Sequence, residues 1–214
     1  MSPTRILSTA FLCALSIFSC RAAASPEGDF WIWFRQNDAA LFDFESDQQA
    51  TFDRLAAEMH KVDPNLTFEF GPKAEGRREF VISADGVRAA FPKVESLFAA
   101  APALPHWKVV KFRPRRAPAD IEYRGMKVSA AKIAVMMEPQ GAVTNLVVVI
   151  PGCSVEASKT CQAIAFLLLD QALGEYDVET KIGRVSVRAP SGRDASAVPL
   201  RALPMAFDAV SARR

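Results

Sequence analysis

Two glutamates on neighbouring predicted strands are the residues best suited to acid–base chemistry. Residues 66–83 hold two stretches of alternating apolar and polar side chains around a Gly-Pro turn, which predicts a β-hairpin. Aligning the apolar faces pairs Phe68 with Phe80 and places Glu69 opposite Glu79. Facing carboxylates repel each other, and the repulsion raises the pKa of one of them. The pair is therefore a candidate acid–base pair of a hydrolase-type enzyme, or part of a charged face.

A run of basic residues follows the hairpin. Eight Lys and Arg residues lie between positions 108 and 132, against two acidic ones. A strand that starts at Trp107 would alternate Lys111, Arg113 and Arg115 onto one face beside the hairpin. Such a face can bind an anionic ligand or form ion pairs with the acidic hairpin, and both interpretations stay open.

An acidic group surrounds the end of a later predicted helix. This helix is expected to end at Leu173, with Gly174 as its C-cap. Carboxylates at a helix C-terminus oppose the helix dipole, so the chain accepts a cost there. The group binds a partner, a cation or Arg184, or is simply a solvated turn. Its members are Asp170, Glu175, Asp177 and Glu179.

Other familiar site chemistries have no complete residue set here. The two histidines, His60 and His106, have no partner at metal-ligand spacing, so we expect no metal site. No Gly-x-Ser-x-Gly or phosphate-binding Gly-x-x-x-x-Gly-Lys motif occurs, and Ser83 stands alone at a strand end. We expect no catalytic residue of these classes and no cofactor.

The first 24 residues have the pattern of a secretory signal peptide. Arg5 precedes the uncharged segment 6–19, and three alanines at 22–24 provide a cleavage site. An alternative is a lipoprotein, cleaved before Cys20 and anchored through it. Removing residues 1–24 takes away two arginines and leaves the basic residues equal in number to the 24 acidic ones. Net charge therefore gives no argument for nucleic acid as a partner.

The two remaining cysteines, Cys153 and Cys161, are predicted to form a disulfide in an oxidising compartment. Eight residues of continuous helix would hold them about 12 Å apart, which is too far for a bridge. The bridge thus requires residues 154–157 to turn back as a loop before the helix begins. Two free buried thiols are the alternative, and the Cys-x-x-Cys motif of redox enzymes is absent.

The order of predicted elements favours one α+β domain over residues 25–214. Hairpins and helices are mixed without a regular βαβ alternation, which indicates a largely antiparallel or mixed sheet with helices mainly on one face. Beyond the hairpin, strands are predicted at 107–112, 121–128, 133–137, 143–150 and 179–188, and helices at 92–101 and 200–210.

Several strings in this chain resemble an uncharacterised bacterial family. They include Phe-Glu-Phe-Gly-Pro at 68–72, Arg-Glu-Phe-Val-Ile-Ser-Ala-Asp-Gly at 78–86, Phe-Arg-Pro-Arg at 112–115 and Gly-Glu-Tyr-Asp-Val-Glu-Thr at 174–180. The resemblance covers roughly residues 30–205. It implies a shared fold unit, and it transfers no catalytic residue because the family has no assigned activity.

These observations predict an exported, periplasmic or secreted protein that binds a partner and is not an enzyme. The expected partner is an envelope protein or an anionic ligand, with no nucleic acid, and with membrane contact only through a lipid anchor at Cys20. The alternative is a hydrolase-type enzyme that uses Glu69 and Glu79. Binding candidates are Glu69, Glu79, Lys111, Arg113, Arg115, Asp170, Glu175 and Asp177.

Overall fold

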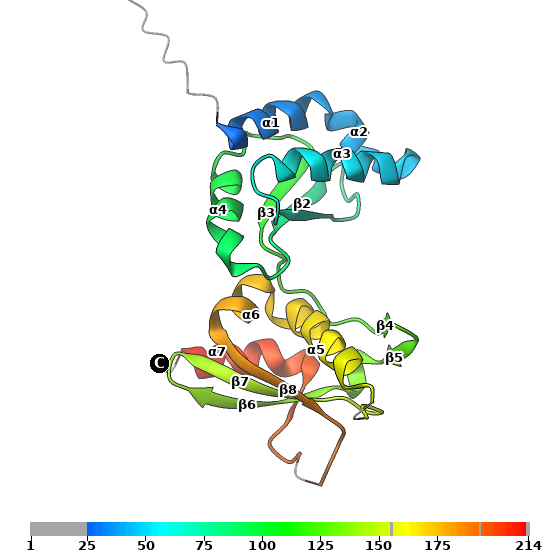
Figure 1. The fold of residues 1–214 in the computed structure, drawn as a ribbon, viewed down its shortest axis with the longest axis vertical. Helices are drawn as coiled ribbons and strands as arrows, with labels where there is room; N and C mark the ends of the chain where they lie inside the picture. The colour runs from blue at the N-terminus through cyan, green and yellow to red at the C-terminus, as the bar shows by residue number, and fades with distance from the viewer. Residues whose placement is uncertain (1–24, 155, 193, 213–214) are drawn as a thin grey trace, which may run out of the picture.

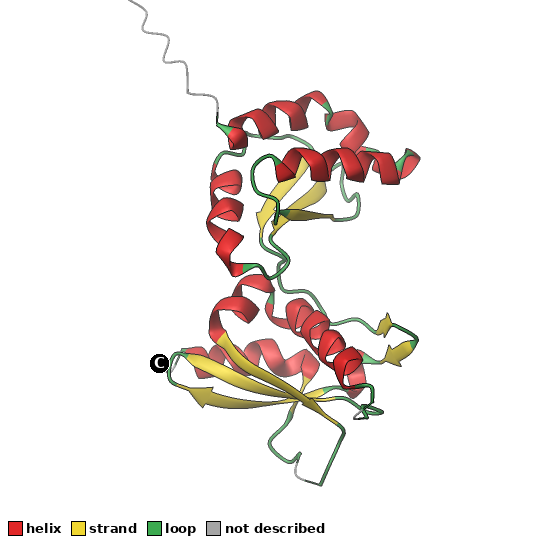
Figure 2. Ribbon diagram, in the orientation of Figure 1, coloured by secondary structure: helices red, strands yellow, loops and turns green. Residues whose placement is uncertain are grey.

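The computed structural model describes residues 25–154, 156–192 and 194–212, and it confirms the α+β fold class. Figure 2 shows helices and strands gathered in two lobes that are joined by one crossing segment, residues 112–120. The described strands form three sheets, so the expected sheet is divided between the lobes. The predicted signal peptide, residues 1–24, lies outside the described residues.

The N-terminal lobe packs helices around a three-stranded sheet of order β1-β2-β3 (Figure 1). β1 and β2 are antiparallel, as the hairpin pattern predicts, and β3 runs parallel to β2. The helices of this lobe are α1 (Pro26–Gln36), α2 (Asp38–Phe42), α3 (Gln48–His60) and α4 (Phe91–Ala99), and its strands are β1 (Thr67–Phe70), β2 (Arg78–Ser83) and β3 (Trp107–Lys111).

Aromatic side chains form the core of this lobe. Phe34 of α1 and Phe80 of β2 are fully buried, and their ring centroids lie 4.9 Å apart. Trp107 meets Phe34 edge-on at 5.1 Å. Aromatic pairs at these distances stabilise a core beyond the effect of their buried area. The aromatic-rich start of the chain therefore fixes α1 against the sheet.

The C-terminal lobe places helices on one face of a four-stranded sheet of order β8-β7-β6-β9 (Figure 1). β7 is a central strand, as its Val- and Ile-rich sequence predicts. The core of the C-terminal lobe is mainly aliphatic. The elements are β4 (Ile121–Tyr123), β5 (Met126–Val128), β6 (Ala134–Gln140), β7 (Val143–Val149), α5 (Ser158–Leu173), α6 (Glu175–Lys181), β8 (Ile182–Arg188), β9 (Val198–Pro199) and α7 (Leu203–Ser211).

The strand predicted from residue 179 starts later than expected. β8 begins at Ile182, and the residues before it form the short helix α6. Gly174 has φ 78°, a left-handed conformation that ends α5 and lets a second helix begin at once. Glu175 and Asp177 therefore lie in the first turn of α6, where the helix dipole stabilises negative charge. The prediction that these carboxylates oppose a helix dipole was wrong.

Cys153 and Cys161 form a disulfide, and their Cα atoms lie 6.1 Å apart. Cys161 lies in the first turn of α5, while Cys153 precedes the helix and directly follows the turn at 151–152. The chain thus turns back before α5 begins, as the bridge requires. Among the described residues, no helix is long and apolar enough to cross a membrane.

The junction of the lobes is formed by the crossing segment and α6. Tyr176 of α6 contacts Phe112 and Phe91, with ring centroids 5.1 and 5.9 Å apart. The Arg116 backbone N–H donates to the Gln171 carbonyl at 2.6 Å. Buried apolar side chains form one cluster in each lobe. The single domain expected over residues 25–214 stays a prediction.

Candidate functional site

The predicted pair of Glu69 and Glu79 does not form. In the hairpin, Phe68 lies opposite Ile82 and Phe70 opposite Phe80, so the register differs by two residues from the predicted one. Both registers keep the apolar side chains on the same face, and the alternating pattern alone does not distinguish them. Glu69 faces Val81 instead of Glu79.

Glu79 forms ion pairs with two basic side chains. Lys108 Nζ lies 2.9 Å from its Oε1, and Arg116 Nη2 lies 2.7 Å from its Oε2. The hydrogen bond from Arg116 lowers the pKa of Glu79, and Lys108 acts in the same direction. A carboxyl with a lowered pKa is a poor general acid. The acid–base role proposed from sequence for this pair therefore has no geometric support.

Glu69 instead pairs with Arg113, which is the centre of the lobe junction. Arg113 Nε lies 2.6 Å from Glu69, and Nη2 lies 2.6 Å from Asp85. Nη1 lies 3.5 Å from Asp170 of α5. One guanidinium thus meets carboxylates from both lobes, and it brings together three of the residues that sequence singled out, Glu69, Arg113 and Asp170.

The predicted basic face of Lys111, Arg113 and Arg115 does not exist. β3 ends at Lys111, and Phe112 has φ 61°, which turns the chain out of the sheet. Lys111 forms an ion pair with Glu95 at 3.3 Å. Arg113 and Arg115 follow the turn to the junction, so the alternation of a strand does not apply to them.

Arg115 ties the crossing segment to the C-terminal lobe. Its Nη1 and Nη2 donate to both carboxylate oxygens of Asp208 at 2.8 Å, and Nη2 also lies 2.6 Å from Asp177. Its Nε donates to the Leu173 carbonyl at 3.0 Å. A planar guanidinium suits this two-oxygen geometry, and the contact lowers the pKa of Asp208. Arg115 and Asp177 thus hold the crossing segment against the C-terminal lobe.

Glu175 is the carboxylate that fastens the lobes together. Its side chain is 0% exposed, and Oε1 accepts hydrogen bonds from the backbone N–H groups of Ala84 at 3.0 Å and Gly86 at 3.2 Å. Oε2 accepts from the Arg113 N–H at 3.1 Å. A buried carboxylate with three N–H donors is well satisfied. We call these contacts the latch, and its role is structural.

Two adjoining hollows open beside the latch, with volumes of about 240 and 280 Å³. Both are lined by Asp85 of the N-terminal lobe, by Arg113, and by Leu167 and Asp170 of α5. Because these residues come from both lobes, we call the two hollows together the interlobe cleft.

Additional side chains complete the walls of the interlobe cleft. The first hollow also contains Glu69 and Arg116, and the second contains Tyr123, Phe166 and Glu179. Phe166 and Leu167 are 41% and 43% exposed, which is high for large apolar side chains. The lining of the cleft thus combines acidic side chains with exposed apolar ones.

The carboxylates of the cleft are incompletely neutralised. The pKa of Asp170 is raised to about 6, mainly by burial, against the opposing effect of Arg113, and the nearby charges of Glu175, Glu179 and Asp85 contribute to the rise. Burial also raises the pKa of Glu179, followed by the charge of Glu175. The charge of Arg88 acts in the opposite direction on Glu179.

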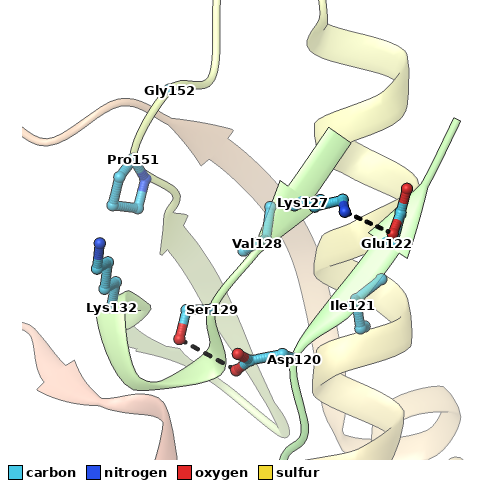
Figure 3. A pocket seen from close by; sticks show the side chains of 9 residues that line it. All are labelled: Asp120, Ile121, Glu122, Lys127, Val128, Ser129, Lys132, Pro151 and Gly152. Atoms are coloured by element: carbon cyan, nitrogen blue, oxygen red, sulfur yellow. Dashed lines mark hydrogen bonds and ion pairs between the residues drawn. The ribbon is translucent and has the colours of Figure 1, made fainter. Parts of the chain in front are cut away.

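A larger pocket lies elsewhere, with a volume of about 670 Å³ beside the β4–β5 hairpin (Figure 3). Its acidic residues are engaged locally: Asp120 accepts from the Ser129 hydroxyl at 3.0 Å, and Glu122 pairs with Lys127 at 3.3 Å. Lys132 points toward Pro151 across the opening in Figure 3. No predicted binding candidate lines this pocket.

Sequence reasoning missed Asp85 as a site residue. The Asp-Gly step at 85–86 signals a turn, and Asp85 indeed has φ 50°. Nothing local indicates that this turn meets α5 and α6 from the other lobe. Among the described residues, no group of three or more His, Cys, Asp or Glu side chains could hold a metal ion.

Comparison of the chain with protein-family models, with curated proteins and with solved structures finds no match.

Proposed function

We propose that this chain is an exported, non-enzymatic binding protein whose interlobe cleft takes a ligand with a cationic group next to an apolar part. The observation that carries the proposal is the charge imbalance inside a confined cleft. Four carboxylates line the cleft, against the two basic side chains Arg113 and Arg116. Arg116 is already paired with Glu79, which does not line the cleft. The carboxylates are Glu69, Asp85, Asp170 and Glu179.

A bound ammonium or guanidinium group would relieve this imbalance. In a partly buried site, an opposite charge stabilises carboxylates more strongly than it does in water. Asp170 lies where the two hollows meet, so it is the expected direct partner of the cation. Asp85 and Glu69 already have close contacts with Arg113.

Phe166 and Leu167 would contact the apolar part of the ligand. Both belong to α5 and line the cleft, four and three residues before Asp170. Small-molecule sites commonly combine apolar walls with a few polar groups that fix orientation. This arrangement favours an aromatic or aliphatic amine, or a peptide with a basic side chain.

The experiment is an NMR titration of the isotope-labelled protein with 2-phenylethylammonium, with neutral 2-phenylethanol as the matched ligand. We expect saturable amide shifts at residues 85–86 and 163–179 for the amine alone. Asp170→Asn should weaken binding roughly tenfold, the effect of one charge-assisted hydrogen bond. Glu122→Gln, in the pocket of Figure 3, is the control and should bind normally. Equal binding of the alcohol would contradict the proposal.

The proposed location is the periplasm or the extracellular space. The Cys153–Cys161 disulfide supports it, because such bridges persist in oxidising compartments. The signal-like residues 1–24 support it independently. Intact mass of the protein from its native host should show a chain that starts at Ser25. An acylated chain that starts at Cys20 would indicate a lipoprotein, and an intact Met1 would contradict export.

Acid–base catalysis by Asp170 is a second candidate function. A carboxyl with a pKa of about 6 at the meeting point of two hollows is suited to proton transfer near neutral pH. It predicts hydrolysis of some member of a panel of chromogenic esters and glycosides, with a rate that changes around pH 6. Loss of that activity in Asp170→Asn would support catalysis, and unchanged activity would remove this candidate.

A further inference from the structure

A cationic pocket adjoins the interlobe cleft beside strands β2 and β3 of the N-terminal sheet. It has a volume of about 330 Å³ and is lined by Arg77, Lys108, Arg116 and Glu79, among others. Arg116 also lines the first hollow of the cleft, so the two spaces are neighbours. Arg78 lies at this pocket too, but its guanidinium pairs with Glu45.

Backbone pairing fixes the positions of three of these residues. Glu79 and Lys108 lie side by side in the parallel register of β2 and β3. Arg77 closes a tight turn through two hydrogen bonds with Ala74, each 2.9 Å long. The backbone positions of these residues are thus set before a ligand binds, which lowers the entropic cost of binding.

Glu79 shows that this arrangement accommodates an anion. Its Oε1 accepts from Lys108 at 2.9 Å and its Oε2 from Arg116 at 2.7 Å. An ammonium has three donors and a guanidinium has five, so both cations keep donors beyond those that Glu79 uses. Arg77 uses Nη2 on the Trp107 carbonyl at 3.3 Å and also keeps donors.

The charges of the pocket are unbalanced in the opposite sense to those of the cleft. Arg77, Lys108 and Arg116 stand against the single carboxylate Glu79. The lowered pKa of Glu79, which the Arg116 hydrogen bond dominates, has the same cause. An added anion would complete the neutralisation.

We propose that Arg77, Lys108 and Arg116 form a subsite for an anionic group, a carboxylate or a phosphate. In the unliganded protein, Glu79 accepts some of the hydrogen bonds that Lys108 and Arg116 can donate. The subsite stands on its own geometry and does not depend on the cleft binding a cation. Charge-assisted bonds from guanidinium and ammonium groups suit both kinds of anion.

The test is an NMR titration of the protein at constant ionic strength, with inorganic phosphate and acetate as separate probes. We expect saturable shifts confined to residues 72–79 and 106–116 with at least one probe. The stronger of the two identifies the preferred anion. Arg77→Gln and Lys108→Gln should each weaken binding roughly tenfold, the effect of one charge-assisted bond.

Glu79→Gln gives the sharpest outcome, because it should strengthen anion binding several-fold by releasing Lys108 and Arg116. If the ion pairs of Glu79 are only structural, the Glu79→Gln variant will not bind the anion. Lys111→Gln is the matched control on β3, since Lys111 pairs with Glu95 and does not line the pocket. Absence of saturable shifts with both probes, or equal weakening by Lys111→Gln, would overturn the proposal.

Discussion

The latch and the interlobe cleft are neighbouring parts of one junction, but they treat carboxylates in opposite ways. In the latch, Glu175 is fully buried and has three backbone N–H donors. In the cleft, Asp170 has one distant contact with Arg113, at 3.5 Å, and its pKa is raised. Burial with complete hydrogen bonding makes a carboxylate structural, whereas burial without it leaves a carboxylate available to a ligand.

Removing the latch should have the largest effect on stability. Glu175→Ala leaves three buried N–H groups without acceptors, and we expect a loss of about 3 kcal/mol or more in the free energy of unfolding. Urea unfolding checks this, followed by tryptophan fluorescence, since all three tryptophans lie in the N-terminal lobe. Glu179→Gln on the same helix is the control and should be neutral or stabilising, because the pKa of Glu179 is raised. Equal losses in both variants would end the distinction between latch and cleft.

Replacing Cys153 and Cys161 by Ser should cost about 2–3 kcal/mol, the chain-entropy effect of a short closed loop. The bridge lies in the C-terminal lobe, so this variant asks whether the lobes unfold together. If the predicted single domain is correct, tryptophan fluorescence and circular dichroism will shift to the same lower urea midpoint. An unchanged fluorescence midpoint would show that the latch does not couple the lobes.

Gly174→Ala should destabilise the junction by about 1–2 kcal/mol. Gly174 has φ 78°, and an added Cβ would lie 3.0 Å from the Arg113 carbonyl oxygen. Gly125→Ala is a matched control, because Gly125 also has φ 78° but has open space around its Cα. Thermal unfolding of both variants separates backbone strain from close packing. Equal shifts in Tm would show that the contact with Arg113 is unimportant.

Asp170→Asn should raise the stability at pH 7, by roughly 1 kcal/mol after allowance for solvent screening. Between the unfolded pKa near 4 and the folded pKa of about 6, the folded state holds the extra proton. The free energy of unfolding therefore falls as pH rises through this window, and the cost is fully present above pH 6. Urea midpoints from pH 4 to 8 should show a smaller decline in the variant. A parallel decline would mean that Asp170 does not titrate abnormally.

Local patterns predicted much of the fold. Apolar–polar alternation predicted the hairpin, and the run of Val and Ile predicted the central strand β7. Gly174 marked the end of α5, and the short Cα separation that a disulfide needs required the turn before α5. The register of the hairpin did not follow, because a shift of two residues leaves every side chain on the same face.

The site was predictable only in part, since it depends on contacts between distant segments. Glu69, Arg113, Asp170 and Glu175 do meet at the junction. Their meeting requires Phe112 to leave the strand with a positive φ, which a β-favouring aromatic residue gives no reason to expect. The helix α6 was missed because seven residues are too few for a periodic signal.

The most direct test of the central claim is the carboxyl titration of Asp170, followed by ¹³C NMR with and without saturating 2-phenylethylammonium. The free protein should show a pKa of about 6 for Asp170. A cation bound in the cleft favours the ionised carboxylate, so the pKa should fall when the ligand is present. A pKa that is near 4 in the free protein, or that does not change with the amine, would contradict the assignment of the interlobe cleft as a cation-binding site.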